Sequence, residues 1–183
     1  WDSAMDIASV AATIARAIGY QSPDRAYCLG LFHNCGVPLL YRAHANYQAV
    51  LEESYANPSP RVIDTENTQL RTNHAVVGYF VAKSWSLPAD LCEVIAEHHS
   101  VENIFRNQAA SYDHGKKTLM AILKMSEHIC RLHQTLGNQE VDHEWDAIGT
   151  DLLAYVGLSD LDYDDITAQM ENIGISGSGY YDH

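Results

Sequence analysis

Histidine is the residue type through which this sequence could do chemistry. In the stretch "GLFHNCGVP" (30–38), His33 is followed by Asn34 and lies between two apolar runs. An imidazole nitrogen binds zinc, iron or nickel, whereas an amide cannot ionise and is a poor metal ligand. A metal-dependent hydrolase would therefore lack one anionic ligand here. The stretch is an active site, the remnant of one, or ordinary packing.

Two further histidines have the same inward placement, and another lies beside one of them. At a period near 3.6 residues, His33, His74 and His98 fall on the apolar faces of three separate segments, and His99 adjoins His98. Each of them alone is more often a hydrogen-bonded core residue than a ligand. Ligands that converge from separate helices of a bundle are, however, a recognised kind of metal site. Their coincidence predicts a histidine-lined pocket between helices.

The segments that must position these histidines are predicted to be helices throughout, because apolar residues recur at helical spacing without two-residue alternation. Gly19 ends the first helix, Ser22 and Pro23 begin the second, and Pro88 begins the helix that leads to His98. Trp85 is expected to pack at the joint between two helices. The expected helices are 2–18, 23–35, 38–55, 73–85, 88–99, 116–136 and 161–173, with a polar stretch after the loop 56–60 and a loop at 101–115.

The chain is expected to form one compact all-α domain. Its 183 residues, 46% hydrophobic and 19% charged, are enough to bury a core, and they show no repeat or linker. The domain is predicted to span residues 1–173, followed by a flexible tail at 174–183. Because the chain starts at Trp1 without a methionine, we expect upstream sequence to exist.

Composition excludes several classes of function. A formal net charge of −13 argues against binding to nucleic acid or to an anionic membrane surface, both of which need a basic footprint. No apolar run approaches the ~18 residues of a membrane span, and no signal peptide is recognisable. The four cysteines form no C-x-x-C pair, so we expect reduced thiols in a cytoplasmic protein. They are Cys28, Cys35, Cys92 and Cys130.

Two long motifs carry a family resemblance. The segments "CLGLFHNCGVPLL" and "TNHAVVGYFVAKSWSLPADLCEVIAEHHS" resemble the HDOD family, the HD-related output domains of bacterial signalling proteins. The resemblance implies an HD-like helical bundle and a regulatory role. It also implies that the family's N-terminal helical subdomain is missing from this chain, so that residues 1–173 represent the remaining part.

The catalytic relatives of that family need a first-helix histidine, a His-Asp pair, further histidines and a late aspartate. The resemblance places Ser3 at the first of these positions and Asn34 at the paired aspartate, and Val37 replaces a lysine that often follows. Losing the aspartate removes a negative charge together with a strong ligand atom. The matching positions are Ser3, His33, Asn34, His74, His98, His99 and Glu127.

These substitutions predict a non-catalytic domain without a cofactor, in which His33 and Asn34 form hydrogen bonds with each other or with neighbouring backbone groups. The expected remnant pocket contains Ser3, His33, Asn34 and Glu127, and it or a neighbouring surface would bind a small ligand or a protein partner. A divalent metal held by His33, His74, His98 and His99, with Glu127, stays open as an alternative. That alternative implies a metal-dependent phosphohydrolase acting on a nucleotide or a cyclic dinucleotide. The third hypothesis is a pure assembly subunit, which forms a stable complex with a partner independently of any ligand.

Overall fold

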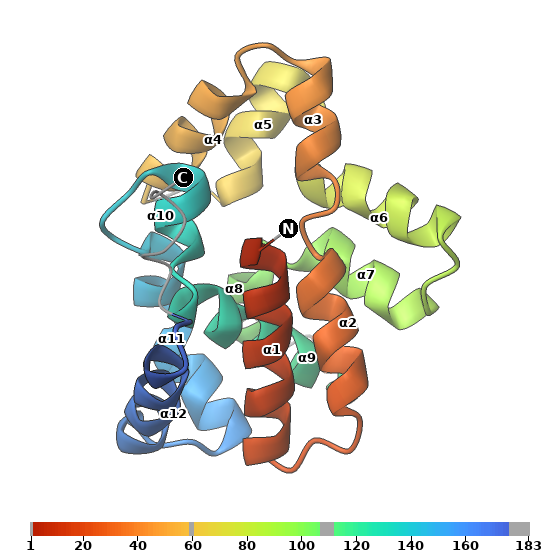
Figure 1. Cartoon of the computed structure of the whole chain (residues 1–183). Helices are drawn as coiled ribbons and strands as arrows, with labels where there is room; N and C mark the ends of the chain where they lie inside the picture. The colour runs from red at the N-terminus through yellow and green to blue at the C-terminus, as the bar shows by residue number, and fades with distance from the viewer. Residues whose placement is uncertain (1, 59–60, 107–111, 176–183) are drawn as a thin grey trace.

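The computed structural model describes residues 2–58, 61–106 and 112–175, and these ranges are helical with no strand (Figure 1). The predicted all-α fold is therefore confirmed. The helices are α1 (Asp2–Ala17), α2 (Pro23–Phe32), α3 (Val37–Ala43), α4 (Tyr47–Ala56), α5 (Val62–Leu70), α6 (His74–Ser84), α7 (Ala89–Glu97), α8 (Val101–Arg106), α9 (His114–Ile129), α10 (Leu132–Gly137), α11 (His143–Val156) and α12 (Asp160–Asn172).

Local signals account for several helix starts. Asn73 precedes α6, and its side chain accepts a hydrogen bond from the backbone N–H of Val76 at 2.9 Å. Before α12, Ser159 and Asp162 form a reciprocal capping box. Pro23 begins α2, where its missing N–H costs nothing. These caps fix where the histidine-bearing helices begin relative to the core.

The main core lies around α1, α2 and α9, which stand side by side in the lower half of Figure 1. Ile7 and Ile14 of α1 are buried against this core, as predicted from the stripe on that helix. A glycine lets α1 and α2 approach closely, because a Cβ added at Gly30 would lie 2.8 Å from the Cα of Ala8. The most deeply buried run belongs to α9 and comprises Leu119, Met120, Ala121, Ile122, Leu123 and Met125.

A smaller second core lies under α3, α4 and α5, at the top of Figure 1. Tyr47 is fully buried there, and its hydroxyl donates to the carboxylate of Glu66 in α5. This contact ties α4 to α5 and carries a buried carboxylate toward α6. The apolar members of the second core are Val37, Leu40, Tyr47, Val50 and Leu51.

Several predicted boundaries are wrong. The single helix predicted for 38–55 is two helices, because the chain turns through His44 in an extended conformation. The single helix predicted for 116–136 breaks at Arg131, whose φ of 51° is incompatible with a continuous helix. Helices also form at α5, α8 and α11, which the sequence analysis left as polar stretch, loop or unassigned. Their stripes are short or rich in polar residues, so periodicity alone did not find them.

The joint at Trp85 also differs from expectation. Its side chain is 52% exposed and contacts Phe32 edge-on, with ring centroids 5.5 Å apart.

Other predictions concern the tail, the cysteines and membrane spans. Most of the predicted loose tail, residues 176–183, lies outside the described ranges, and so does Trp1. All four cysteines are free thiols, as predicted. No helix in the described part of the chain is long and apolar enough to cross a membrane.

Candidate functional site

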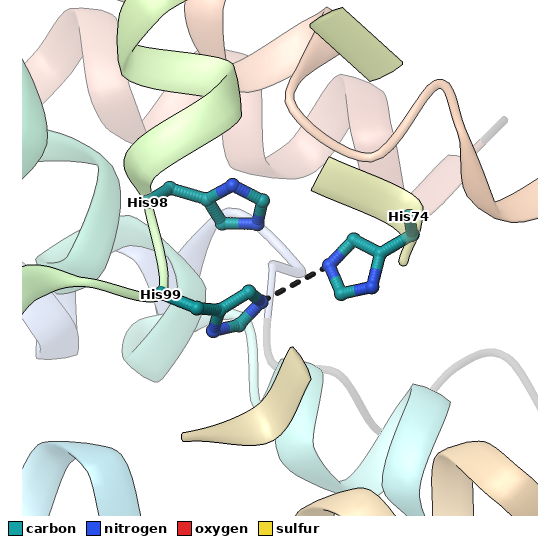
Figure 2. A group of neighbouring side chains, drawn as sticks. All are labelled: His74, His98 and His99. Atoms are coloured by element: carbon teal, nitrogen blue, oxygen red, sulfur yellow. Dashed lines mark hydrogen bonds between the residues drawn. The ribbon is translucent and has the colours of Figure 1, made fainter. Parts of the chain in front are cut away.

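Three of the predicted histidines meet in the middle of the molecule (Figure 2). His74 is the first residue of α6, and His98 and His99 follow the last turn of α7. One nitrogen from each ring lies within 4.8 Å of the nitrogens from the other two. None of the three side chains is more than 3% exposed. The start of α6, which Asn73 caps, and the end of α7 therefore place the three imidazoles together at one buried position.

The fourth predicted histidine joins them from α2. His33 caps the C-terminus of that helix, is 1% exposed, and meets the ring of His98 edge-to-face at a centroid distance of 5.7 Å. The structure thus brings together the three histidines predicted from periodicity and the adjoining His99. We refer to His33, His74, His98 and His99 as the histidine cluster.

Backbone carbonyls fix the tautomers of two of these rings. Nδ1 of His33 lies 2.8 Å from the carbonyl oxygen of Gly30, and Nδ1 of His98 lies 2.7 Å from that of Ile95. Because a carbonyl oxygen can only accept, Nδ1 carries the proton in both rings. Each Nε2 is then a bare acceptor, and among the described residues neither has a hydrogen-bond partner.

Carboxylates hold the other two rings. Nδ1 of His74 contacts Glu66 at 2.7 Å, Nδ1 of His99 contacts Glu144 at 3.1 Å, and the two Nε2 atoms face each other at 3.0 Å, as the dashed line in Figure 2 shows. These three contacts need three protons, whereas two neutral imidazoles carry two. Burial lowers the pKa of His99 well below its ordinary value, which disfavours a second proton on that ring. In the contact between the two rings, one Nε2 must donate and the other must accept.

A buried lysine supplies a permanent cation beside the histidine cluster. Lys124 of α9 is 3% exposed, and its Nζ lies 2.8 Å from Glu127 and 2.7 Å from Glu144. Burial works against its charge, but the two carboxylates raise the pKa of Lys124 above its ordinary value. The remaining oxygen of Glu127 has no hydrogen bond among the described residues and lies 3.4 Å from Nε2 of His33.

Burial and the nearby charge of Lys124 both disfavour the protonated forms of His33 and His98. Desolvation lowers the pKa of His33 to about 3, with Lys124 as a further cause. It lowers the pKa of His98 well below the ordinary value as well. Desolvation also raises the pKa of Glu127 to about 7, although Lys124 opposes that rise. At neutral pH, His33 and His98 are therefore uncharged acceptors.

The predicted remnant pocket is only partly correct. Ser3, His33 and Asn34 line one cavity of about 410 Å³, whose other walls are mostly apolar, but Glu127 does not border it. Glu127 lies on the other side of His33 and borders a smaller cavity of about 20 Å³ together with Lys124. The helix α2 ends at Phe32, and the side chains of the next two residues, His33 and Asn34, leave the chain in different directions.

His33 forms the predicted hydrogen bond with neighbouring backbone, through Nδ1 and the carbonyl oxygen of Gly30, and not one with Asn34. Asn34 differs from the expectation, because its Oδ1 is buried without a partner among the described residues. An amide at this position contributes nothing to the histidine cluster. The residue that breaks the His-Asp pattern is thus turned toward the apolar cavity.

The donor set fits one metal ion better than two. In His74, His98 and His99, Nδ1 is hydrogen-bonded to a carboxylate or a carbonyl oxygen, which leaves Nε2 as the ligand atom, and imidazoles bind metals in this arrangement. A metal would take the place of the contact between Nε2 of His74 and Nε2 of His99. His74, His98 and His99 would hold a single zinc-like cation, which would supply Lewis acidity. A second cation would need a bridging carboxylate, and Asn34 is not one. Lys124 already places a positive charge next to Glu127.

Three charged residues of the site escaped the sequence analysis. Lys124 had a readable signal, because it interrupts the buried run "LMAILKMSEHI" on the inner face of its helix. Glu66 and Glu144 had none, since they lie in helices that periodicity did not find and meet the histidines only through the tertiary fold.

Comparison with known proteins decides the family. The sequence profile of the HDOD domain matches residues 1–101, more than half of the chain. The chain belongs to the HDOD family. The matched part of this HDOD chain includes the whole histidine cluster, whereas Lys124, Glu127 and Glu144 lie beyond it.

Solved structures agree on the fold of this HDOD chain. An HDOD domain protein with unknown function from Geobacter sulfurreducens matches 94% of it at 22% identity, with a TM-score of 0.63. A "Putative phosphohydrolase" from Shewanella amazonensis SB2B matches 97% of it at 18% identity, with a TM-score of 0.62. The chain spans 57% and 60% of the lengths of these two proteins. No curated protein matches it.

Proposed function

We propose that this HDOD chain is a non-catalytic regulatory or output domain of bacterial signal transduction. It would act by binding a protein partner, or a small ligand in the cavity beside His33, rather than by turning over a substrate. Residues 1–173 would act as one domain in the cytoplasm. The proposal rests on the histidine cluster, because the cation beside it is Lys124, a side chain of the protein itself.

Lys124 is the single observation that carries this proposal. A hydrolase of the HD type needs metal-bound water, and the metal needs anionic ligands. Here Glu127 and Glu144, two of the three carboxylates that contact the cluster, are paired with an ammonium group 2.7–2.8 Å away. A dication placed among the same residues would meet that positive charge in a buried, weakly screened environment. The arrangement therefore favours a stable structural network over a metal-activated nucleophile.

Access to the cluster also favours binding over turnover. The cavity of about 410 Å³ borders His33, and another of about 80 Å³ borders His99, so each touches the cluster at one edge. His74 and His98 are 0% exposed. A phosphate ester would need to reach ligands and water together, whereas a ligand in the larger cavity needs only its apolar walls and the free oxygen of Asn34.

One observation supports the alternative of a metal-dependent phosphohydrolase acting on a nucleotide or cyclic dinucleotide. Nε2 of His33, Nε2 of His98 and one oxygen of Glu127 are buried without hydrogen bonds, which costs free energy unless something binds them. A cation between His33 and Glu127, whose unpartnered atoms lie 3.4 Å apart, would satisfy two of these atoms, and a metal held by His74, His98 and His99 would satisfy the third. The name of the Shewanella protein points the same way for that protein.

Turnover measurements separate the two functions. Purified protein is assayed with bis(4-nitrophenyl) phosphate and with cyclic dinucleotides, in Mn²⁺ and in Fe²⁺, next to His33→Ala as a control. The regulatory proposal predicts rates equal to those of His33→Ala under every condition. Metal-dependent turnover that His33→Ala abolishes would replace it with the hydrolase.

A further inference from the structure

A second group of metal-ligating side chains lies outside the histidine cluster. It comprises His128 at the end of α9, His133 in α10 and Asp142, which caps α11. One ligand atom from each lies within 4.8 Å of the other two. We propose that these three residues bind a single zinc-like dication that joins the ends of α9, α10 and α11.

The distances suit a tetrahedral ion. Oδ2 of Asp142 lies 2.8 Å from Nδ1 of His128 and 3.4 Å from Nδ1 of His133. Ligands bound to zinc at about 2.0–2.1 Å stand roughly 3.3 Å apart at tetrahedral angles. The pair with His133 already has this separation, and the pair with His128 reaches it by opening about half an ångström. Two imidazoles and one carboxylate leave a fourth position for water or another ligand.

His133 gives independent evidence for an absent ligand. Its side chain is only 7% exposed, and its Nδ1 is buried without a hydrogen-bond partner among the described residues. The 3.4 Å to Asp142 is too long for a good hydrogen bond. A buried polar atom of this kind normally has a partner. The atom points at the one carboxylate that would share the metal.

The surrounding contacts would hold the ligands in place. Oδ1 of Asp142 accepts the backbone N–H of Trp145 at 3.0 Å, so the helix cap leaves Oδ2 free for a metal. The ring of His128 stacks on Trp145 at a centroid distance of 4.4 Å and an angle of 12°. Trp145 in turn stacks on Tyr163. Fixing both ligands before the ion arrives lowers the entropic cost of binding.

An entry path and the local charge favour a cation. His128 is 30% exposed, and it borders a cavity of about 420 Å³ whose wall includes Asp146, Asp160 and Asp164. These acids raise the concentration of cations at the mouth. The helices α10 and α11 lie away from α6 and α7 in Figure 1, and the site shares no residue with the histidine cluster.

Zinc titration of the purified chain tests the proposal. Calorimetry and thermal unfolding are measured with Zn²⁺, and Co²⁺ absorption reports the coordination. Wild type should bind one Zn²⁺ at this site and gain thermal stability. His128→Phe keeps the stack on Trp145, and Asp142→Asn keeps the cap acceptor. Each should weaken binding ~10-fold or more.

Matched variants assign the ion to this site. His143→Phe alters a neighbouring histidine of the same helix start and should bind Zn²⁺ as wild type does. His98→Gln alters the histidine cluster and should keep the Zn²⁺ that His128→Phe and Asp142→Asn lose. Circular dichroism checks that each variant folds. The proposal is overturned if wild type binds no Zn²⁺, if His128→Phe and Asp142→Asn bind it with unchanged affinity, or if only His98→Gln loses it.

Discussion

At the scale of residues, the site is organised by a charge that periodicity does not reveal. Three histidines were predicted from their spacing, and all three converge with the adjoining His99. Their electrostatics depend instead on Lys124, whose ammonium group lies between Glu127 and Glu144. Without that lysine, the buried carboxylate of Glu127 and the partly buried carboxylate of Glu144 would both lose their cationic partner next to uncharged imidazoles.

Lys124→Met tests this role through stability. Removing the buried cation should lower the free energy of unfolding by roughly 3–5 kcal/mol, because Glu127 and Glu144 are left uncompensated. Lys116→Met, which removes an ion pair with Glu93 whose carboxylate is 49% exposed, should cost at most about 1 kcal/mol. Urea unfolding followed by circular dichroism measures both. Equal losses in the two variants would show that Lys124 is not a central counter-ion.

His33 predicts a dependence of stability on pH. Its pKa falls from an ordinary value of 6.5 to about 3 on folding. Between these values the unfolded chain binds a proton that the folded chain does not, so His33 makes the protein less stable as pH falls from 6.5 toward 3. His98 and His99 act in the same direction, because their pKa values are also lowered.

Glu127 changes the stability of the protein with pH in the opposite direction. Its pKa rises from 4.5 to about 7, so the folded chain binds the extra proton and Glu127 lowers stability as pH rises from 4.5 to 7. His33→Gln should therefore reduce the acid-side slope by up to about 1.4 kcal/mol per pH unit. Glu127→Gln should remove its own contribution, leaving stability rising more steeply from pH 4.5 to 7. The urea concentration at the midpoint of unfolding is measured for each variant between pH 4 and 8. A pH dependence of stability equal to that of wild type would contradict these pKa assignments.

At the scale of elements, the turn between α2 and α3 positions both His33 and the apolar cavity. Gly36 lies in this turn against α6, where a Cβ would come 2.1 Å from the carbonyl oxygen of His74 and 2.7 Å from the N–H nitrogen of Gly78. Only glycine allows this approach. The close contact sets the separation between the helices that carry His33 and His74.

Gly36→Ala should disturb this contact severely. The added methyl meets backbone that cannot rotate away, so we expect a loss of stability at or above the upper end of about 1–3 kcal/mol. Gly115→Ala in the first turn of α9 meets only a side-chain oxygen of Asp113 at 3.2 Å and should be close to neutral. Thermal unfolding compares the two. A Gly36→Ala protein as stable as wild type would mean that the turn is not tightly constrained.

Sequence patterns located the elements with long apolar stripes and missed the others. The helices α1, α6, α7 and α12 follow from spacing and caps, and they deliver three of the four histidines with α2 supplying the fourth. The polar helix α5 carries Glu66 inward only because α4 and α6 cover it. Burial of that carboxylate is a tertiary property, so no local pattern could have predicted it.

At the scale of the whole molecule, two features stand apart: a sealed histidine cluster and an apolar cavity beside it. The cavity includes half-exposed Trp85 and the unsatisfied oxygen of Asn34, and it shares only His33 with the cluster. A signalling domain can use such a cavity to read a ligand while the polar cluster keeps the bundle rigid. The net charge of −13 favours partners with basic surfaces.

Nitrogen-15 NMR of the histidine side chains tests most directly whether the cation at the histidine cluster is Lys124 rather than a metal. Spectra are recorded at neutral pH on purified protein, before and after stoichiometric Zn²⁺, which is diamagnetic and shifts mainly the rings that bind it. We predict protonated Nδ1 and bare Nε2 in His33 and His98, and signals of the four cluster histidines that Zn²⁺ leaves unchanged. A Zn²⁺-induced shift of the Nε2 signals of His74, His98 and His99 would place the metal among them and contradict the account.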